Sequence, residues 1–583
     1  MAKRWRILPH DTERIGRLAR AAGIPAVVAQ LLIARGIGDV EAARRFLEPK
    51  LSALHDPARL PGCIEAAERV RGAIQSGRRI IIYGDYDADG VTGTAILWKC
   101  LKLLGADVGY YVPHRIDEGY GVHCDAIETL GAQGTGLVVT VDCGIASMES
   151  LQLASRRGLE VVVTDHHAPH GRLPPAVAIV HPSLADRPYP FPGLSGSGVA
   201  LKLAWAICQR AAGGKRVSQP MRDFLVAAVG LAALGTVADV VPLLDENRIL
   251  VRHGLVSLKR CPPLGLAKLM ETVGLDEKPA LDAEDIAFVL GPRLNAAGRL
   301  GQARLAVELL VTDRPERATE LAGYLNGLNE TRQTLERSVY LAAHKQAKEQ
   351  FDPQRDAALV LAGHGWHPGV IGIVAGRLAE KYHRPVVLVA WDRLGVKPGI
   401  GSARSIPGFD LHAALQACGH HLLRHGGHAA AAGLTIEADR WEAFRAEFCE
   451  YAAEHIGEEE RVAELTIDAE GPLSEFTLPV ARQIEQLGPF GQANARPLMC
   501  ATGVRLAAPP RQIGDGGRHL ALQLTQYGVT LRAVAFGGGE WADQLSRLDG
   551  PIDVAFRPVI NTFRGRQNVE LHLVDWRTSH ADR

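Results

Sequence analysis

Aspartate and histidine side chains follow several apolar runs of the sequence. The segment YGDYDADG places Asp85, Asp87 and Asp89 at alternating positions directly after such a run, and Gly90 follows. Further candidates come after other apolar segments: Asp142 after LVVTV, Asp165-His166-His167 after VVVT, and Asp239 after GLAALGTVA. Carboxylate oxygens combined with imidazole nitrogens suit Mn²⁺ and related divalent ions better than a structural calcium site. The pattern predicts a divalent metal centre.

A single DxDxD segment is equally compatible with a solvated turn, and a lone His-His pair is common on surfaces and in cores. The recurrence of such residues within one region favours the metal centre. Two ions about 3.5–4 Å apart, bridged by a shared carboxylate, activate water and stabilise an in-line phosphoryl displacement. Without cations, so many carboxylates cannot all stay ionised. The expected chemistry is therefore phosphate-ester hydrolysis, with metal ions that also stabilise the fold.

Basic and glycine-rich segments further along the chain predict phosphate binding. The segment GPRLNAAGRL supplies Arg293, Asn295 and Arg299, and guanidinium groups bind phosphate oxygens in bidentate fashion. The alternative is that these arginines lie on a helix surface. The segments GWHPGVIGIVAGRL, GSARS and GGHAAAAG supply a second set of candidates, whose glycines allow close approach of a sugar-phosphate chain. This second set comprises Trp366, His367, Arg404 and His428.

Histidines are frequent between His364 and His428, which raises the question of another metal site. We interpret His420, His421 and His425 as ordinary helix positions instead. The helix that begins near Gly369 offers backbone amides to an anion.

The region from about residue 79 to 245 predicts the element that positions the aspartates. RRIIIYG, ADVGYYVP, GLVVTVDCG, LEVVVTDHH and AVAIVHP are short β-branched runs separated by helix-length segments. This alternation predicts a doubly wound, mostly parallel α/β sheet, in which ligands collect at the carboxyl ends of the strands.

The rest of the chain predicts four further parts. Residues 1–60 have the pattern of short amphipathic helices that cap a larger unit, and 61–312 form the α/β domain. Residues 313–352 predict a long connecting helix. Residues 353–456 predict a second α/β domain with strands at AALVLAG and PVVLVA, and 457–583 predict a small β-barrel.

Composition limits the class of protein. The 583 residues carry 65 Lys+Arg and 65 Asp+Glu, and the zero net charge excludes a protein that grips nucleic acid by overall basicity. The nine cysteines are scattered without a CxxC pair, which favours a reducing cytoplasm. The basic N-terminus lacks the apolar stretch of a secretory signal. Phe224–Ala238 is apolar but shorter than the ~20 residues of a membrane span, so we expect a buried helix.

The motifs YGDYDADG, VTVDCGI, TDHH, LGTVADVVPL and GPRLNAAGRL occur in this order in the chain. Together they resemble the DHH phosphoesterase superfamily and, within it, the bacterial RecJ exonucleases. The resemblance covers most of the chain. It implies a DHH domain joined by a long helix to a DHHA1 domain, followed by an oligonucleotide-binding (OB) barrel.

The resemblance also implies roles for individual residues. The main metal ligands would be Asp87, Asp89, Asp142, His166 and Asp239, with Asp142 as the bridge between two ions, Mn²⁺ or Mg²⁺. Asp85, as a further ligand, and Asp165 would support or complete the site, and His167 would lie near the scissile phosphate or the attacking water. Pyrophosphatases of the superfamily have a histidine four residues before the aspartate that matches Asp87, where this chain has Tyr83.

The leading hypothesis is a metal-dependent exonuclease that degrades single-stranded DNA, by resemblance from the 5′ end, in DNA repair and recombination. One alternative is a phosphodiesterase of short oligoribonucleotides or cyclic dinucleotides, which would need neither the N-terminal segment nor the β-module. Another is a catalytically silent replication scaffold, against which the full set of acidic positions argues. We expect a monomer without membrane association. A single-stranded-DNA-binding protein and a RecQ-type helicase are partners implied only by the family.

Overall fold

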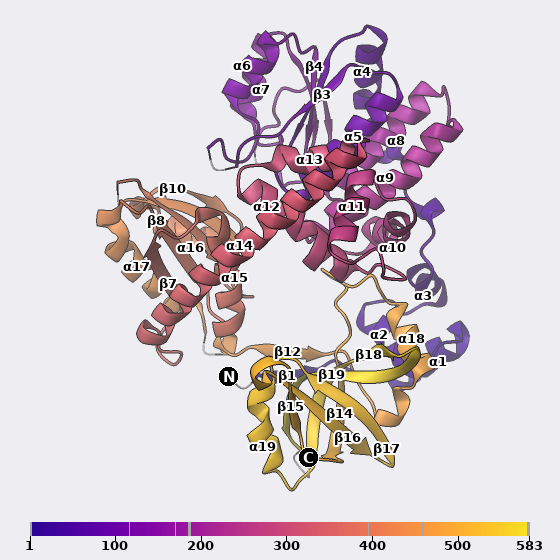
Figure 1. Ribbon diagram of the computed structural model, residues 1–583, viewed down its shortest axis with the longest axis vertical. Helices are drawn as coiled ribbons and strands as arrows, with labels where there is room; N and C mark the ends of the chain where they lie inside the picture. Colours follow the sequence, from indigo (N-terminus) through magenta and orange to yellow (C-terminus); the bar gives the residue numbers. More distant parts are fainter. Residues whose placement is uncertain are drawn as a thin grey trace. The chain divides into compact units, whose positions relative to one another are not determined.

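The computed structural model describes residues 3–115, 117–169, 171–184, 188–394, 396–457 and 459–579 (Figure 1). The chain divides into two compact units. The first unit comprises Pro57–Asp239 and Val256–Ala463, with the residues up to Arg4. The second unit comprises Trp5–Asp56, Val240–Leu255 and Glu464–Arg583.

A parallel sheet forms the centre of the N-terminal half of the first unit. Its strands pair in the order β3-β2-β4-β5-β6, and every pairing is parallel. The strands are β2 (Ile80–Gly84), β3 (Val108–Tyr111), β4 (Leu137–Val141), β5 (Glu160–Thr164) and β6 (Ala178–Val180). Each matches one of the predicted β-branched runs, so the carboxyl ends of β2, β4 and β5 meet at one edge.

Helices cover both faces of this sheet (Figure 1). On one face, side chains such as Tyr83, Val138 and Val163 form a core with α6 and α7. On the other face, α5 packs against β2, and α8 against β4 and β5. The predicted doubly wound architecture is confirmed. The helices of this region are α4 (Cys63–Gln75), α5 (Ala88–Leu103), α6 (Cys124–Ala132), α7 (Met148–Arg156) and α8 (Gly196–Ala211).

The apolar segment before Asp239 forms α9 (Gln219–Ala238), which begins earlier than predicted and has 20 residues. By length and composition alone, α9 could cross a membrane, and so could α1 (Thr12–Ala22) and α2 (Ala26–Ala34) if the bent pair were one span. However, every residue of 228–237 is buried, and α9 packs against α5 and α8. It is a core helix that brings Asp239 to the sheet edge.

A long helix, α14 (Pro315–Gln350), follows, as predicted for the connecting segment. Its buried positions include Leu321, Leu325, Val339 and Ala343, whose spacings are compatible with one helix face. The N-terminal part packs against α11, α12 and α13, and the C-terminal part against β7 and α15. The preceding elements are α10 (Asp245–Arg260), α11 (Leu264–Thr272), the π-helical turn η3 (Asp285–Leu290), α12 (Gly291–Arg299) and α13 (Ala303–Val311).

The C-terminal part of the first unit is a second α/β domain with a mixed sheet in the order β10-β11-β9-β8-β7. Strands β7 and β8 are parallel, whereas β8–β9, β9–β11 and β10–β11 are antiparallel. The strands are β7 (Leu359–His364), β8 (Val386–Trp391), β9 (Gly399–Arg404), β10 (Leu422–Gly427) and β11 (Ala431–Ile436). The helices are α15 (Pro368–Tyr382), α16 (Leu411–Ala417), the short η4 (Gly419–His421) and α17 (Trp441–His455).

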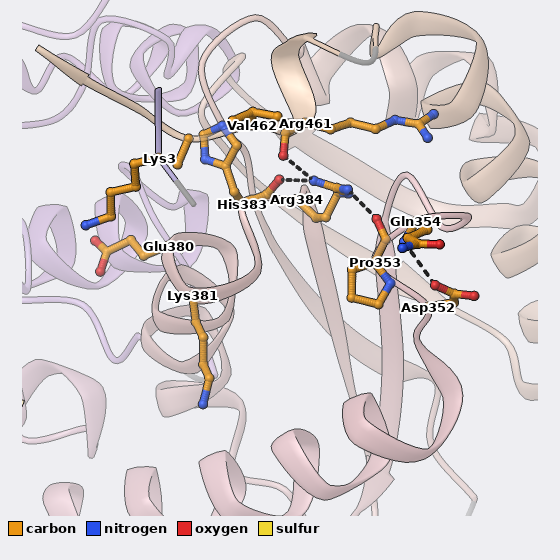
Figure 2. Close-up of a pocket in the computed structure, with 11 residues that line it drawn as sticks. Lys3, Asp352, Pro353, Gln354, Glu380, Lys381, His383, Arg384, Arg461 and Val462 are labelled. Carbon is orange, nitrogen blue, oxygen red and sulfur yellow. Dashed lines mark hydrogen bonds between the residues drawn. The ribbon is translucent and has the colours of Figure 1, made fainter. Parts of the chain in front are cut away.

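A cavity of about 760 Å³ in this domain is lined by both acidic and basic side chains (Figure 2). Arg384 is 3 % exposed and donates hydrogen bonds to the carbonyl oxygens of Pro353, Asp356, His383 and Arg461. Its guanidinium therefore joins three separate chain segments. The lining contains none of the predicted site residues, and its buried arginine serves the fold.

The second unit is a curved β-domain. Its main sheet runs in the order β13-β14-β18-β19-β17-β16-β15, and β14 also pairs with β16 through Arg505↔Thr525 and Leu506↔Leu524. This pairing brings the two ends of the β14-β18-β19-β17-β16 run together over a short stretch, in agreement with the OB-like barrel that we expected. The strands are β12 (Glu464–Ile467), β13 (Ala469–Glu470), β14 (Met499–Leu506), β15 (Arg511–Ile513), β16 (His519–Gln526), β17 (Val529–Ala535), β18 (Ile552–Phe563) and β19 (Arg566–Thr578), with helices α18 (Leu478–Glu485) and α19 (Ala542–Ser546).

The N-terminal helices belong to the core of this β-domain. Val28, Leu31 and Leu32 of α2 are fully buried in one cluster with strand residues such as Leu522 and Phe556. The N-terminal strand β1 (Arg4–Ile7) pairs with β12, and α3 (Val40–Leu47) completes this segment. Residues near the two ends of the chain thus form one hydrophobic core.

Candidate metal centre and adjacent arginines

The turn after β2 fixes the first group of aspartates. Asp87 caps α5, because its Oδ1 accepts hydrogen bonds from the backbone N–H groups of Asp89 (2.9 Å) and Gly90 (3.0 Å). Asp89 is 1 % exposed and accepts from the N–H groups of Gly196 (2.6 Å) and Ser197 (3.0 Å) at the start of α8. Two helix N-termini therefore orient these carboxylates.

Asp142 follows β4 with a φ of 63°, a left-handed conformation that is uncommon for a residue with a side chain. It is 1 % exposed. The start of α8 approaches so closely that a Cβ at Gly196 would lie 2.6 Å from Asp142 Oδ1. A strained backbone and a tightly packed carboxylate are typical of a functional position.

The segment after β5 is organised by Asp165. Its carboxylate accepts hydrogen bonds from the backbone N–H groups of Ile145, His166 and His167, and it also contacts His167 Nδ1 at 2.9 Å. The fully buried His181 holds the same segment through a 2.8 Å bond from Nε2 to the His167 carbonyl. Asp165 therefore positions both histidines.

His166 brings the groups together. Its Nε2 lies 3.1 Å from Asp142 Oδ1, 3.4 Å from Asp239 Oδ2 and 4.0 Å from Asp89 Oδ2. Three overlapping sets of donors have the spacing needed to hold a metal ion: Asp85-Asp87-Asp142, Asp142-His166-His167 and Asp89-His166-Asp239. Asp142 and His166 each belong to two of these sets, and of the two only the carboxylate of Asp142 has two oxygens to offer to two ions.

The electrostatics of this cluster fit a cation site. Burial, together with the neighbouring carboxylates, raises the pKa of Asp85 and Asp142 well above the usual range and that of Asp239 to about 9. Burial lowers the pKa of His166, which keeps its imidazole neutral. For His167, burial is outweighed by the hydrogen bond with Asp165, and the pKa is raised. Crowded carboxylates next to a neutral imidazole form a site that needs a positive charge.

Three buried ligand atoms of the cluster show whether its residues fit a metal ion. Asp85 Oδ1, Asp142 Oδ1 and His166 Nε2 are buried and have no hydrogen-bond partner within the described part of the chain. Buried polar atoms without a partner are costly. All three belong to donor sets with metal-binding spacing, so divalent ions fit this site.

Two tyrosines complete the surroundings of the aspartates. Tyr83 is fully buried, and its hydroxyl donates to the carbonyl of Gly121 at 3.2 Å, so this side chain supports the sheet. Tyr120, which the sequence analysis did not single out, lies 3.0 Å from His167 Nδ1 and donates to the Asp142 carbonyl at 3.1 Å.

The segment GPRLNAAGRL forms helix α12. Asn295 Oδ1 accepts a hydrogen bond from the Ala88 N–H at 2.8 Å, so this residue anchors the turn between the metal-site aspartates. Arg293 is half-buried and donates to Asn326 and to the Val289 carbonyl. Arg299 donates to the Gly369 carbonyl at the start of α15.

Arg299 also belongs to a group of arginines close to Asp87. Burial is the largest cause that lowers the pKa of Arg299 to about 10. The charges of Arg115, Arg332 and Arg404 lower this pKa further, whereas the charge of Asp87 raises it. Burial and, after it, the charge of Arg115 lower the pKa of Arg404. Arg115 and Arg332 were missed by the sequence analysis. Arg115 follows β3, the neighbour of β2, so the predicted parallel sheet was the available signal for it.

The remaining predicted residues of the second domain have different surroundings. Trp366 is 9 % exposed and packs in the core between β7 and α15. His367 caps α15 by accepting from the Gly369 N–H at 3.1 Å, so that amide is not available to an anion. Arg404 donates to the Ala403 carbonyl, and His428 is exposed after β10. Of this set, Arg404 belongs to the arginine group.

The clustered histidines do not all lie on helices. His420 and His421 lie on the short 3₁₀ turn η4, and His425 lies on strand β10. The prediction of ordinary helix positions is wrong for His425, because the chain enters the sheet directly after η4.

The parallel sheet with its edge of aspartates and histidines, followed by a linking helix and a mixed sheet, defines a DHH phosphoesterase. Family models agree: the DHH family N-terminal domain matches residues 79–231, the DHHA1 domain matches 355–454, and the RecJ OB domain matches 467–575.

Curated relatives cover nearly the whole chain. The single-stranded-DNA-specific exonuclease RecJ of Bacillus subtilis is 36 % identical over 98 % of this chain and 70 % of its own length. The RecJ of Escherichia coli is 36 % identical over 94 % of this chain and 95 % of its own. The chain belongs to the RecJ family of single-stranded-DNA-specific exonucleases.

A solved structure supports the same assignment. The crystal structure of Thermus thermophilus RecJ in complex with Mn²⁺ matches with a TM-score of 0.83 and 35 % identity over 99 % of this chain and 80 % of that chain. The fold, including the linking helix and the β-domain, is therefore that of a RecJ protein.

Proposed function

We propose that this protein is a metal-dependent exonuclease that hydrolyses the phosphodiester bonds of single-stranded DNA from the 5′ end and releases mononucleotides. The convergence of buried, unpartnered ligand atoms of Asp85, Asp142 and His166 carries this proposal. The 5′-to-3′ direction and a role in DNA repair and recombination come from the family. The alternative substrates, short oligoribonucleotides and cyclic dinucleotides, receive no support from a particular observation.

The ligands of two divalent ions, Mn²⁺ or Mg²⁺, would be Asp85, Asp87, Asp89, Asp142, His166 and Asp239. Such ions supply an activated water and offset the charge that develops on the phosphoryl group. Asp142 would serve both ions, because it belongs to two donor sets and its carboxylate has two oxygens. Asp165 holds His166 and His167 in place, and His167 would contact the scissile phosphate or the attacking water.

Arg115, Arg299, Arg332 and Arg404 would bind the backbone phosphates next to this centre. The positive charges of neighbouring guanidinium groups lower one another's pKa. An anion that lies between such groups stabilises their charged forms. Phosphate contacts carry no sequence information, which suits a nuclease that degrades any strand. We assign Asn295 to support of the metal-site turn, because it accepts a hydrogen bond from the Ala88 N–H. Arg293 would hold α12 against α14 through Asn326.

The β-domain would also bind the strand, consistent with its match to the RecJ OB domain. A single-stranded-DNA-binding protein and a RecQ-type helicase are proposed as partners from the family alone, as are the cytoplasmic location and the monomeric state.

The test is digestion of single strands labelled at either end, with Mn²⁺, Mg²⁺ or a chelator. Label at the 5′ end should appear first as mononucleotide, and the chelator should stop the reaction. Asp142→Asn and His166→Ala should each lower kcat by more than about 100-fold, beyond the 10–100-fold loss typical of a residue that only orients a metal ligand. Strand binding, followed by fluorescence anisotropy, should persist.

Asp125→Asn is the matched control, since Asp125 is an exposed acid on α6 of the same domain. It should retain wild-type activity. Near-wild-type turnover of Asp142→Asn would contradict the two-metal assignment, whereas early release of the 3′ label would contradict only the polarity.

A further inference from the structure

A second group of metal-binding side chains lies in the domain with the mixed sheet. His420 and His421 of η4 face Glu447 of α17, and their ligand atoms all lie within 4.8 Å of one another. These elements contribute nothing to the aspartate cluster. Two imidazoles and one carboxylate are a frequent protein ligand set for zinc.

The distances within this triad fit one small cation. The Nε2 atom of His420 lies 3.2 Å from Glu447 Oε2, and that of His421 lies 2.7 Å from the same oxygen. A tetrahedral ion with Zn–N and Zn–O bonds of about 2.0–2.2 Å separates its ligand atoms by roughly 3.3 Å. The His420 pair already has this spacing, and the His421 pair needs to open by a few tenths of an ångström. The two rings lie side by side with centroids 4.0 Å apart.

The triad combines an anchored inner side with an accessible outer side. The side chain of His421 is 11 % exposed, that of Glu447 38 % and that of His420 62 %. Nδ1 of His421 is buried and has no hydrogen-bond partner among the described residues. Coordination through Nε2 moves the imidazole proton to Nδ1, and a bond to the ion replaces the 2.7 Å hydrogen bond between Nε2 and Glu447 Oε2. An ion can reach the triad from solvent.

We propose that His420, His421 and Glu447 bind one d-block cation of the Zn²⁺ type, with a fourth position open to water. Nitrogen ligands favour Zn²⁺ over Mg²⁺ and Mn²⁺, which prefer the oxygen-rich aspartate cluster. The ion joins η4, which leads directly into β10, to α17, whose Phe444 and Phe448 lie in the domain core. Binding therefore stabilises this domain by linking the start of an exposed strand to a core helix.

The experiment is equilibrium dialysis of the full-length protein against Zn²⁺ in the presence of saturating Mg²⁺, with Co²⁺ absorption as a second readout. The wild type should bind a Zn²⁺ ion that Mg²⁺ does not displace, and its thermal unfolding midpoint should rise. His420→Ala and Glu447→Gln should weaken this binding by more than about 100-fold, since they remove ligands and not merely supporting groups. They should also abolish the tetrahedral Co²⁺ bands.

His412→Ala is the matched control, because His412 is an exposed histidine of the same domain outside the triad. It should bind Zn²⁺ as the wild type does, and so should Asp142→Asn, which alters only the aspartate cluster. His420 is largely exposed, so its loss leaves the core intact. The proposal is overturned if His420→Ala and Glu447→Gln retain wild-type Zn²⁺ affinity, or if Asp142→Asn loses the same ion.

Discussion

Single residues of the aspartate cluster have features that destabilise the metal-free protein but suit the binding of a cation. Asp142 keeps a left-handed backbone, and its Oδ1 is buried without a hydrogen-bond partner among the described residues. Both features cost free energy in the absence of a ligand. The N–H groups that hold Asp87, Asp89 and Asp165 keep these carboxylates in place before any ion binds. This cluster is therefore preorganised for metal binding.

Tyr120 should position His167, because its hydroxyl contacts both His167 Nδ1 and the carbonyl of Asp142. We expect Tyr120→Phe to lower kcat by about 10–100-fold, as for other groups that orient a metal-site residue, with little change in Mn²⁺ affinity. Tyr324→Phe is the control, since Tyr324 has the same exposure (45 % against 44 %) but bonds to Gln302. Equal activities of the two variants would remove Tyr120 from the site.

Asp239 makes the stability of the metal-free protein depend on pH. Its pKa rises from 3.8 to about 9 on folding, so the folded state holds a proton that the unfolded state has released. Its contribution to the free energy of unfolding is therefore fully present below pH 3.8 and is lost as the pH rises to about 9. Asp239→Asn lacks this titration, so in chelator the variant should gain stability relative to the wild type over that interval.

Thermal unfolding at several pH values measures this difference. Saturating Mn²⁺ should reverse the trend for the wild type, since ion binding favours the ionised carboxylate. A wild-type protein that becomes more stable than Asp239→Asn as the pH rises in chelator would contradict the raised pKa.

At the scale of helices and strands, close contacts at glycines bring the metal-site residues together. A Cβ at Gly235 of α9 would lie 2.3–2.5 Å from the side-chain oxygens of Ser197, Asp89 and Thr92. No larger residue fits there without moving α9, which ends at Ala238, directly before Asp239. The approach of α9 to α5 and α8 therefore sets the position of a predicted ligand.

Gly235→Ala should accordingly lower Mn²⁺ affinity and kcat together, each by at least about tenfold, and should lower the unfolding midpoint, because overpacking typically costs about 1–3 kcal/mol. Gly323→Ala is the control, since Gly323 lies in α14, where an added Cβ would meet nothing within 4 Å, and should gain up to about 1 kcal/mol. Isothermal titration with Mn²⁺ and thermal unfolding distinguish the two. Unchanged affinity in Gly235→Ala would show that α9 can shift freely.

The sequence was sufficient to predict elements whose residues act locally. Each β-branched run of the parallel sheet became a strand, and the donors after β2, β4 and β5 meet because parallel strands end at the same edge. Interactions that depend on tertiary packing could not be predicted from the sequence. Arg332 of α14 lies near the other members of the arginine group, and the side chain of Trp366 is buried in the core between β7 and α15. Neither orientation follows from residue spacing alone.

At the scale of the whole molecule, the second unit is assembled from three separate stretches of chain. Arg248 of α10 is 2 % exposed and donates hydrogen bonds to the carbonyls of Phe46, Gln486 and Leu487. These hydrogen bonds connect the three stretches of chain. A truncation near residue 460 would therefore leave α2 and this arginine without their partners. Loss of strand binding in such a truncation could not be assigned to the β-domain surface.

A point substitution tests that surface without dismantling the unit. Phe563 is 67 % exposed and lines a cavity of about 600 Å³ between η7 (Leu473–Glu475) and strands β17, β18 and β19. Aromatic rings that stack on bases contribute about 1–3 kcal/mol each. Phe563→Ala should therefore weaken binding of long single strands by about 5–150-fold, with little effect on the cleavage of very short oligomers that do not extend beyond the metal centre. Tyr527→Asn is the control, because Tyr527 is 86 % exposed on a hairpin turn with a φ of 48°, which asparagine tolerates. If both variants bind long strands as the wild type does, the cavity is not the strand-binding surface of the β-domain; if Phe563→Ala loses short-oligomer cleavage equally, its effect is on the fold.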